Sequence, residues 1–427
     1  MIMKDKMIRI FKSESFLEWY YLIVIFAYIA TLIGDFVRPG MIAAVLMCTI
    51  VVELIFKKKV NIHSVMDVLI VVYFVYRGAS VIWLLKAGIM PISVYTGEFA
   101  VSLLPMIFYF AGRAHFGNDE DNSKSFYKKF VISLIVLGII SAILYGIAPQ
   151  FYCDYLFRWS YISKADASTA HVRMQSVVGS TVFGAIMVLG MTIAVHFMCY
   201  DSKESDAKKN RIFGVVSFVF TMIFAILSNQ RSSMVAAVVV LIYVNYLLFA
   251  RFDYIPRKYA YIEIGAVVAI VVMVFAIKPD FVMKVWARIA SLPSAVSERS
   301  EQWVAAVNNM YSSWFGNGLG SNGHRAVGIE GAHVIADGGL IKMYCEEGVL
   351  GFSLFVYILF LTLKRGIKNI ELYYAEIVTI AMTLITSIGS NVIAFQLVTP
   401  IFWFVIGRIW EECDDTEVFR IKGIRNR

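Results

Sequence analysis

Apolar runs of about twenty residues recur along the whole chain, and short clusters of lysine and arginine separate them. A hydrocarbon layer roughly 30 Å thick requires about 20 apolar residues in each crossing helix. Of the 427 residues, 59% are hydrophobic and only 16% are charged. A soluble domain usually carries about 25% charged residues. Too few polar side chains remain to cover a water-soluble globule, so the sequence predicts an all-α integral membrane protein.

The sequence predicts about twelve transmembrane helices in a single polytopic domain, residues 1–427. The first eighteen residues are basic, but no small-residue cleavage site follows the first apolar run, which we therefore expect to be a permanent helix. The expected helices cover residues 17–36, 41–56, 65–85, 95–110, 130–148, 176–200, 212–227, 233–249, 261–277, 348–363, 374–388 and 398–410.

Lysine and arginine are concentrated in every second loop, with few exceptions. Since short cytoplasmic loops are enriched in these residues, the even helix count places both the N-terminus and the C-terminus in the cytoplasm. The net charge of +8 is explained by this orientation, so nucleic acid is not an expected partner. The five cysteines show no CxxC spacing and no histidine cluster, so neither a metal site nor a cofactor is expected.

Two segments on the expected outer face are longer than ordinary loops. They cover residues 149–175 and residues 278–347, the second lying between the ninth and tenth expected helices. We expect the second to be a large periplasmic loop with amphipathic stretches, one of which places Trp303, Val304 and Val307 on one face. No soluble domain or linker is recognisable, so function is expected between the helices and this outer loop.

Four of the arginines on the outer face, where arginine is depleted in short loops, are the strongest candidates for ligand binding: Arg173, Arg231, Arg288 and Arg299. A guanidinium group can hydrogen-bond two phosphate oxygens at once, and a lipid diphosphate offers several such oxygens. We expect at least two of the four to bind an anionic ligand. The alternative for any one of them is that its side chain reaches to lipid headgroups.

Arg77 lies about two-thirds of the way across the third expected helix. An arginine at the centre of a spanning helix costs about 2.5–3.5 kcal/mol on insertion scales, so a partner is expected. The favoured interpretation is a structural ion pair with Glu98 or Glu53 on a neighbouring helix. Contact with a ligand is the alternative.

His333 is the most suggestive single residue of the large outer loop. It follows a glycine-rich turn and lies near Asp337 and the acidic pair at residues 346–347. An imidazole with a pKa near 6.5 suits a group that accepts a proton from a hydroxyl. The other histidines on this side, His171 and His324, lack that setting. We expect Arg77, Arg325, Asp337 and Trp303 to support the site.

The glycine-rich turn at residues 314–323 contains the spacing GxGxxG between Gly318 and Gly323. A dinucleotide site would require a preceding strand and a surrounding βαβ unit. Neither is predicted here, so the glycines do not indicate a nucleotide cofactor.

Several motifs together resemble one family of membrane enzymes. They are Arg299-x-x-x-Trp303, Trp314-Phe315-Gly316-x-Gly318-x-Gly320, His333, Glu347-Gly348-Val349-Leu350-Gly351, Arg173 to Gly179, and Ser228-Asn229-Gln230-Arg231-Ser232-Ser233. This set, with the helix count and the late outer loop, resembles the O-antigen ligase and O-antigen polymerase (Wzy) superfamily. Two positions depart from the pattern: Val334 stands where the family often has Asn, and Gln230 where it usually has Ser.

The resemblance implies a GT-C-like glycosyltransferase in a bacterial inner membrane with its active site facing the periplasm. It implies an inverting, metal-independent transfer from a glycan on undecaprenyl diphosphate to a sugar hydroxyl. His333 would be the general base, and the outer arginines would neutralise the diphosphate. Membrane lipid is an expected partner, with a chain-length regulator and a flippase as further candidates.

Three functions remain in competition. A polymerase joins the glycan to another lipid-linked repeat unit, whereas a ligase moves it to lipid A–core, and the motifs do not separate the two. The polymerase is preferred because such chains are divergent and fit the family loosely. A transporter or a flippase for lipid-linked oligosaccharides is a third class. The loop at residues 57–64 lacks the Gly/Asp/Arg pattern of the major facilitators, so this class is less favoured.

Overall fold

The computed structural model describes residues 14–30, 39–56, 60, 62, 64–88, 90–114, 120–151, 173–199, 207–252, 254, 283, 286–287, 290, 292–395 and 397–411. Within these ranges the regular structure is entirely helical. Eight helices are long and apolar enough to cross a membrane, so this is an all-α membrane protein. Three shorter apolar helices match the first, second and twelfth expected spans: Leu17–Ala27, Val45–Ile55 and Thr399–Ile409.

The eight candidate spans match the expected helices in order. They are Val65–Lys86, Ile92–Arg113, Lys124–Ile147, Ser180–Met198, Ala207–Leu227, Arg231–Arg251, Gly339–Lys368 and Ile370–Gly389. The ninth expected helix, residues 261–277, lies outside the described residues. The total of twelve therefore stays a prediction.

The first half of the chain forms α2 (Glu14–Ala30), α3 (Pro39–Phe56), α4 (Val65–Ala79), α5 (Val81–Ala87), α6 (Ile92–Glu98), α7 (Phe108–Ala114), α8 (Glu120–Ile147) and α10 (Ser180–Met198). A π-helical turn, Phe99–Leu103, and a 3-10 turn, Leu104–Ile107, join α6 to α7. Pro105 lies in the 3-10 turn, where its missing N–H interrupts the regular α-helical bonding.

The second half forms α11 (Ala207–Leu227), α12 (Arg231–Tyr246), α15 (Leu292–Asn308), α16 (Gly339–Lys368), α17 (Ile370–Gly389) and α18 (Thr399–Ile409). A π-helical turn, Leu247–Arg251, extends α12. Two helices begin earlier than expected: α8 about ten residues and α16 about nine residues before the hydropathy boundary. Both added stretches carry charged side chains, so the long apolar runs begin only after them.

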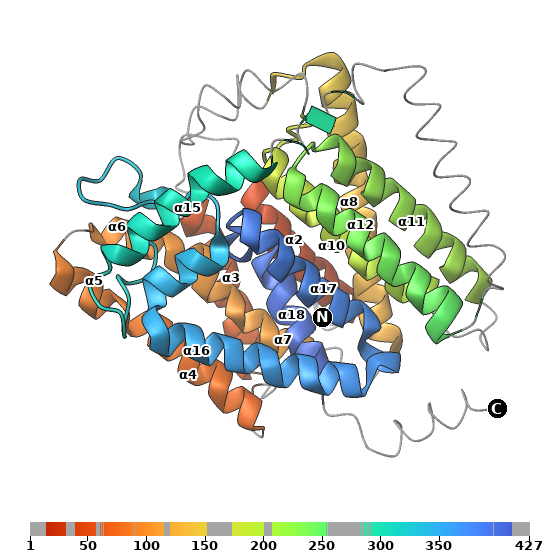
Figure 1. The fold of residues 1–427 in the computed structure, drawn as a ribbon. Helices are drawn as coiled ribbons and strands as arrows, with labels where there is room; N and C mark the ends of the chain where they lie inside the picture. The colour runs from red at the N-terminus through yellow and green to blue at the C-terminus, as the bar shows by residue number, and fades with distance from the viewer. Residues whose placement is uncertain are drawn as a thin grey trace, which may run out of the picture.

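Helix α10 lies near the centre of the bundle and packs against α8, α11, α12 and α17 (Figure 1). Most of its side chains are buried, including Phe183 and Phe197. On the other side of α17, α16 packs against α4, and α18 crosses α7 (Figure 1). The core is continuous through these helices and includes the fully buried Trp403 of α18.

Two glycines allow α7 and α18 to touch through their backbones. A Cβ added at Gly112 would overlap the carbonyl oxygen of Phe404, and a Cβ added at Gly407 would overlap the carbonyl oxygen of Tyr109. Small residues at membrane helix crossings permit this close approach, and the contact itself comes from van der Waals packing. The crossing therefore depends on both glycines.

The bundle has a basic end, defined by contacts between helix termini that carry Lys or Arg. Lys128 of α8 lies over the ring of Phe213 in α11, Arg251 pairs with Glu371 at the start of α17, and Arg365 donates to the carbonyl of Glu411. The opposite end, called the loop end, carries α15 and residues 309–338 (Figure 1). There Gly339 donates to the carbonyl of Ser390 at 3.3 Å, and Met174 donates to the carbonyl of Leu227 at 2.9 Å.

We predict that Gly112→Val separates α7 from α18 and lowers the melting temperature of the detergent-purified protein. Overpacking in a tight core typically costs about 1–3 kcal/mol, and the overlap here is with backbone that cannot rotate away. Gly146→Ala in α8 is the matched control, because nothing lies within 4 Å of its added Cβ. Equal melting temperatures for Gly112→Val and the unmodified protein would contradict the crossing.

Candidate functional site

Helix α16 is broken at Gly348, where φ is 65° and ψ is −172°. The break leaves backbone groups on both sides without partners inside the helix, and buried groups of this kind require partners elsewhere. The glycine segment, residues 314–323, and the two residues before it supply these partners. The bonds run from Asn317 N to Cys345 O (2.8 Å), Gly318 N to Glu346 O (2.9 Å), Val349 N to Ser313 O (2.9 Å) and Leu350 N to Trp314 O (3.2 Å).

Glycine is required on both sides of this contact. A Cβ at Gly316, where φ is 74°, would overlap the backbone of Glu346, and a Cβ at Gly348 would overlap the carbonyl of Trp314. Positive φ is also costly for any residue with a Cβ. The glycine-rich motif therefore docks the outer loop onto the broken helix.

Next to the break, Glu347 is fully buried and is held by three side chains. Its Oε1 lies 2.8 Å from Nε of Arg77, and its Oε2 accepts from the hydroxyl of Tyr73 at 2.8 Å. The hydroxyl of Tyr76 donates to its backbone carbonyl. Arg77 also donates to the carbonyl and hydroxyl of Ser102, both at 3.2 Å. The carboxylate thus joins α4 to α16.

The ion pair expected for Arg77 is present, but the expected partners were wrong. Glu53 instead accepts from the hydroxyl of Tyr21 at 2.9 Å, and Glu98 pairs with Lys342. Glu347 takes the arginine because α16 begins about nine residues before its apolar run, which brings this acid into the helix beside α4.

A second group of buried charges lies one turn earlier in α16. Nζ of Lys342 is 2.6 Å from Oε1 of Glu98 in α6 and 3.3 Å from Oε1 of Glu346. Nε of Arg325, in the 3-10 turn His324–Ala326, lies 3.7 Å from Oε2 of Glu98. The backbone N–H of Asn322 donates to Glu346 at 3.3 Å. This charge cluster, Glu98, Arg325, Lys342 and Glu346, joins α6 and α16 to the outer loop.

Sequence reasoning overlooked Lys342 and Glu346 as members of a site. One signal was available: the two residues are spaced i, i+4 and stand directly before an apolar run. Their partner Glu98 is distant in the chain, so the cluster itself could not be deduced from spacing.

His333 lies on a loop that the glycine segment holds in place. The side-chain amide of Asn322 donates to the carbonyl of His333 at 2.7 Å, and the N–H of Ile335 donates to the carbonyl of Asn322 at 2.9 Å. The imidazole is half-buried and makes no hydrogen bond or ion pair to the residues that the structure describes. The ring is therefore available to a ligand, while its backbone is fixed.

His324 lies near the charge cluster, which its position in the sequence did not predict. Its ring interacts with the carbonyl of Ala336 and feels the charges of Lys342, Asp337 and Glu98. Desolvation by the surrounding loop, and then the positive charge of Lys342, lower the pKa of His324 below 6.5. The edge of the ring is exposed to solvent. A lowered pKa keeps the imidazole of His324 neutral at pH 7.

Arg299 and Trp303 of α15 both contact Asp337. Nη2 of Arg299 lies 2.6 Å from Oδ2 of Asp337, and Nε1 of Trp303 donates to the backbone carbonyl of Asp337 at 2.7 Å. The expected support role of Asp337 and Trp303 is therefore a structural one, since both fix α15 to the loop. Arg299 is already paired, so any ligand must compete with Asp337 for it.

Arg173 and Arg231 belong to the same end of the bundle. Arg173 precedes the bond from Met174 to α11, and Arg231 begins α12 directly after Gln230. The amide of Gln230 donates to the hydroxyl of Ser390 at 3.1 Å. Ser390 in turn accepts from Gly339, the first residue of α16. The residue after Arg173 is thus bonded to the end of α11, and the residue before Arg231 is linked through Ser390 to the start of α16.

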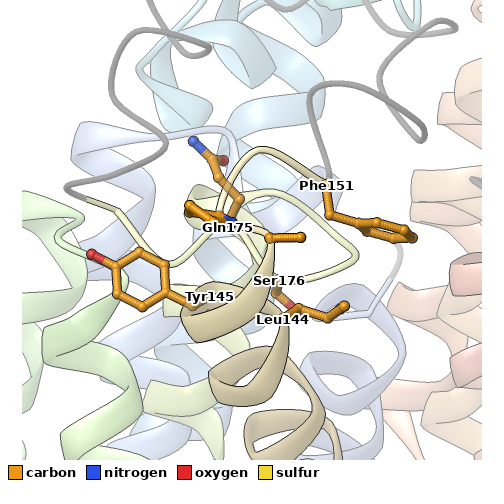
Figure 2. A pocket seen from close by; sticks show the side chains of 7 residues that line it. Leu144, Tyr145, Phe151, Gln175 and Ser176 are labelled. Carbon is orange, nitrogen blue, oxygen red and sulfur yellow. The ribbon is translucent and has the colours of Figure 1, made fainter.

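A small hollow lies between the end of α8 and residues 175–176 (Figure 2). Apolar side chains of Leu144, Tyr145 and Phe151 line it together with the polar Gln175 and Ser176. The hydroxyls of Ser176 and Ser141 are 2.6 Å apart, which fixes the turn.

Arg288 lies outside the described residues. Within the described ranges, no three His, Cys, Asp or Glu side chains gather as a metal site would require.

No family model matches the chain, and no curated protein matches it.

We predict that removing either partner of the buried Arg77–Glu347 pair destabilises the protein strongly. Arg77→Met and Glu347→Gln each leave an uncompensated buried group, and breaking a buried pair costs about 3–5 kcal/mol. The double variant should recover much of the loss, as a double-mutant cycle of melting temperatures would show. Strictly additive losses would contradict direct coupling between the two side chains.

Proposed function

We propose that the chain is a polysaccharide polymerase of a bacterial inner membrane. It transfers a glycan from undecaprenyl diphosphate to a sugar hydroxyl of another lipid-linked repeat unit. The observation that carries this proposal is that Arg173, Arg231, Arg325 and His333 all belong to the loop end of the bundle. The motif resemblance to the O-antigen polymerase and ligase superfamily supplies the reaction.

The orientation follows from the distribution of basic residues. The basic end holds the termini of α8, α11, α12 and α16 with their lysines and arginines, so it faces the cytoplasm in the proposal. The loop end then faces the periplasm. With one further helix at residues 261–277, the spans number about twelve and both chain termini are cytoplasmic.

The proposed chemistry is an inverting displacement. The acceptor hydroxyl attacks the anomeric carbon, the bond from that carbon to the diphosphate oxygen breaks, and the hydroxyl proton passes to His333. The departing diphosphate is already acidic, so it requires neutralisation of its charge, which Arg173 and Arg231 provide without a metal in this proposal. The outer loop limits access of water, which would otherwise compete as acceptor.

We predict that His333→Ala abolishes polymer formation in cells that lack the chromosomal gene, because the proposed base for the hydroxyl proton is lost. His324→Ala is the matched control, since it removes a neighbouring imidazole and should retain most of the polymer. The measurement is the length distribution of lipopolysaccharide chains on a gel, at equal membrane levels of each variant. If His324→Ala abolishes the polymer and His333→Ala does not, the assignment of the base is refuted.

The gene deletion itself distinguishes the polymerase from the ligase. Lipopolysaccharide that carries single repeat units supports the polymerase. Bare core with accumulated lipid-linked polymer would show that the chain is the ligase instead.

We predict that Arg173→Lys and Arg231→Lys each reduce polymer formation at least about tenfold, because an ammonium group cannot make the paired hydrogen bonds of a guanidinium. Arg251→Lys at the basic end is the control, since Arg251 is an exposed partner of Glu371. Full activity of both test variants would refute recognition of phosphate by these two arginines.

A further inference from the structure

The two cations of the charge cluster at the start of α16 differ in burial and in the number of carboxylates that they contact. Lys342 is almost fully buried and contacts both Glu98 and Glu346, at 2.6 Å and 3.3 Å. Arg325 has 35% of its side chain exposed and reaches only Glu98, at 3.7 Å. Lys342 is therefore fixed, whereas Arg325 is the one cation of the cluster that can leave without breaking it.

The charges nevertheless balance only when Arg325 is present. Two cations face two carboxylates, and Oε2 of the buried Glu346 has no hydrogen-bond partner among the described residues. A buried carboxylate without full compensation is costly. Glu98 therefore attracts Arg325 in the absence of any other anion. This attraction competes with the binding of any other anion to Arg325.

The side chain of Arg325 packs on the surface of α6, where a larger side chain at the contact would displace it. Its side chain lies across Gly97 of α6, and a Cβ added there would come within 2.8 Å of Nη1 and 2.9 Å of Cδ. Gly97 lies five residues after Ile92, the start of its span, or roughly 8 Å along the helix axis. A long arginine side chain at this depth can extend to the level of lipid phosphates.

We propose that Arg325 is an exchangeable cation, which pairs with Glu98 in the free protein and moves to a phosphate group of an anionic lipid or a lipid-linked diphosphate. This inference deepens the proposed function and rests on it for the diphosphate as ligand. Lys342 keeps Glu98 and Glu346 paired after the exchange. Glu98 thus acts as a competitor for the ligand and sets how strongly the site binds phosphate.

Gly97→Ala tests the exchange with every charge retained. The added methyl group displaces the flexible Arg325, and alanine is favoured over glycine within a helix, so α6 itself is not strained. Glu98→Gln tests it by removing the competing charge. The Arg325–Glu98 pair is long, at 3.7 Å, and its arginine is partly exposed, so it is weak, and we expect each variant to bind phosphate about two- to fivefold more tightly. Arg325→Ala should bind at least about tenfold more weakly and should cancel the gain from either variant.

The measurement is the dissociation constant, taken from the rise in melting temperature of protein in phosphatidylcholine nanodiscs as ligand is added. One arm adds undecaprenyl diphosphate and the other adds phosphatidylglycerol. Gly146→Ala, with open space around its Cβ, is the control and should match the unmodified protein. The inference is overturned if Gly97→Ala binds both ligands no more tightly than Gly146→Ala does.

The two arms separate this inference from the proposed function. Tighter binding of phosphatidylglycerol alone by Gly97→Ala supports the exchange and contradicts the diphosphate donor. If undecaprenyl diphosphate binds the protein, but neither ligand distinguishes any of the variants from the unmodified protein, Arg325→Ala included, the exchange is refuted while the proposed donor remains.

Discussion

The loop end of this protein depends on a break in one helix. At Gly348 the backbone of α16 leaves the helical conformation, and the hydrogen-bonding groups released there are satisfied by the glycine segment at residues 314–323. Because buried backbone groups need partners, the break and the segment stabilise each other. The same segment fixes the loop of His333 through Asn322. One local departure from helical geometry therefore determines where the outer loop lies.

Charges reinforce this contact from inside the membrane-spanning region. Glu347 beside the break binds Arg77 of α4, and Glu346 and Lys342 bind the outer loop and α6. Ionisable side chains in a membrane protein are costly unless paired, and they often mark functional regions. Here they hold α4, α6 and α16 in register at the end of the bundle that carries Arg173 and Arg231. The polymerase proposed above would use this rigid frame to position a diphosphate and an imidazole.

The sequence was sufficient for the features that depend on local composition. Apolar runs predicted the spans, since burial in lipid requires about 20 such residues whatever the neighbouring helix is.

The sequence was insufficient where segments that are distant in the chain meet. Arg77 was expected to pair with Glu98 or Glu53, but the polar start of α16 brings Glu347 to it instead. The glycine motif was read as a turn, because its role depends on a helix break that only the folded chain reveals. The ion pair of Lys342 could not be predicted for the same reason, since its partner Glu98 lies in a separate span.

The most direct test of the account is a reconstituted reaction with the unmodified protein. Purified protein in liposomes would be given an undecaprenyl-diphosphate-linked oligosaccharide in buffer containing a metal chelator, and the products would be resolved by mass. The account predicts products longer by whole repeat units, with release of one undecaprenyl diphosphate for each unit added. Movement of the intact lipid-linked oligosaccharide across the bilayer, with no change in its length, would contradict it.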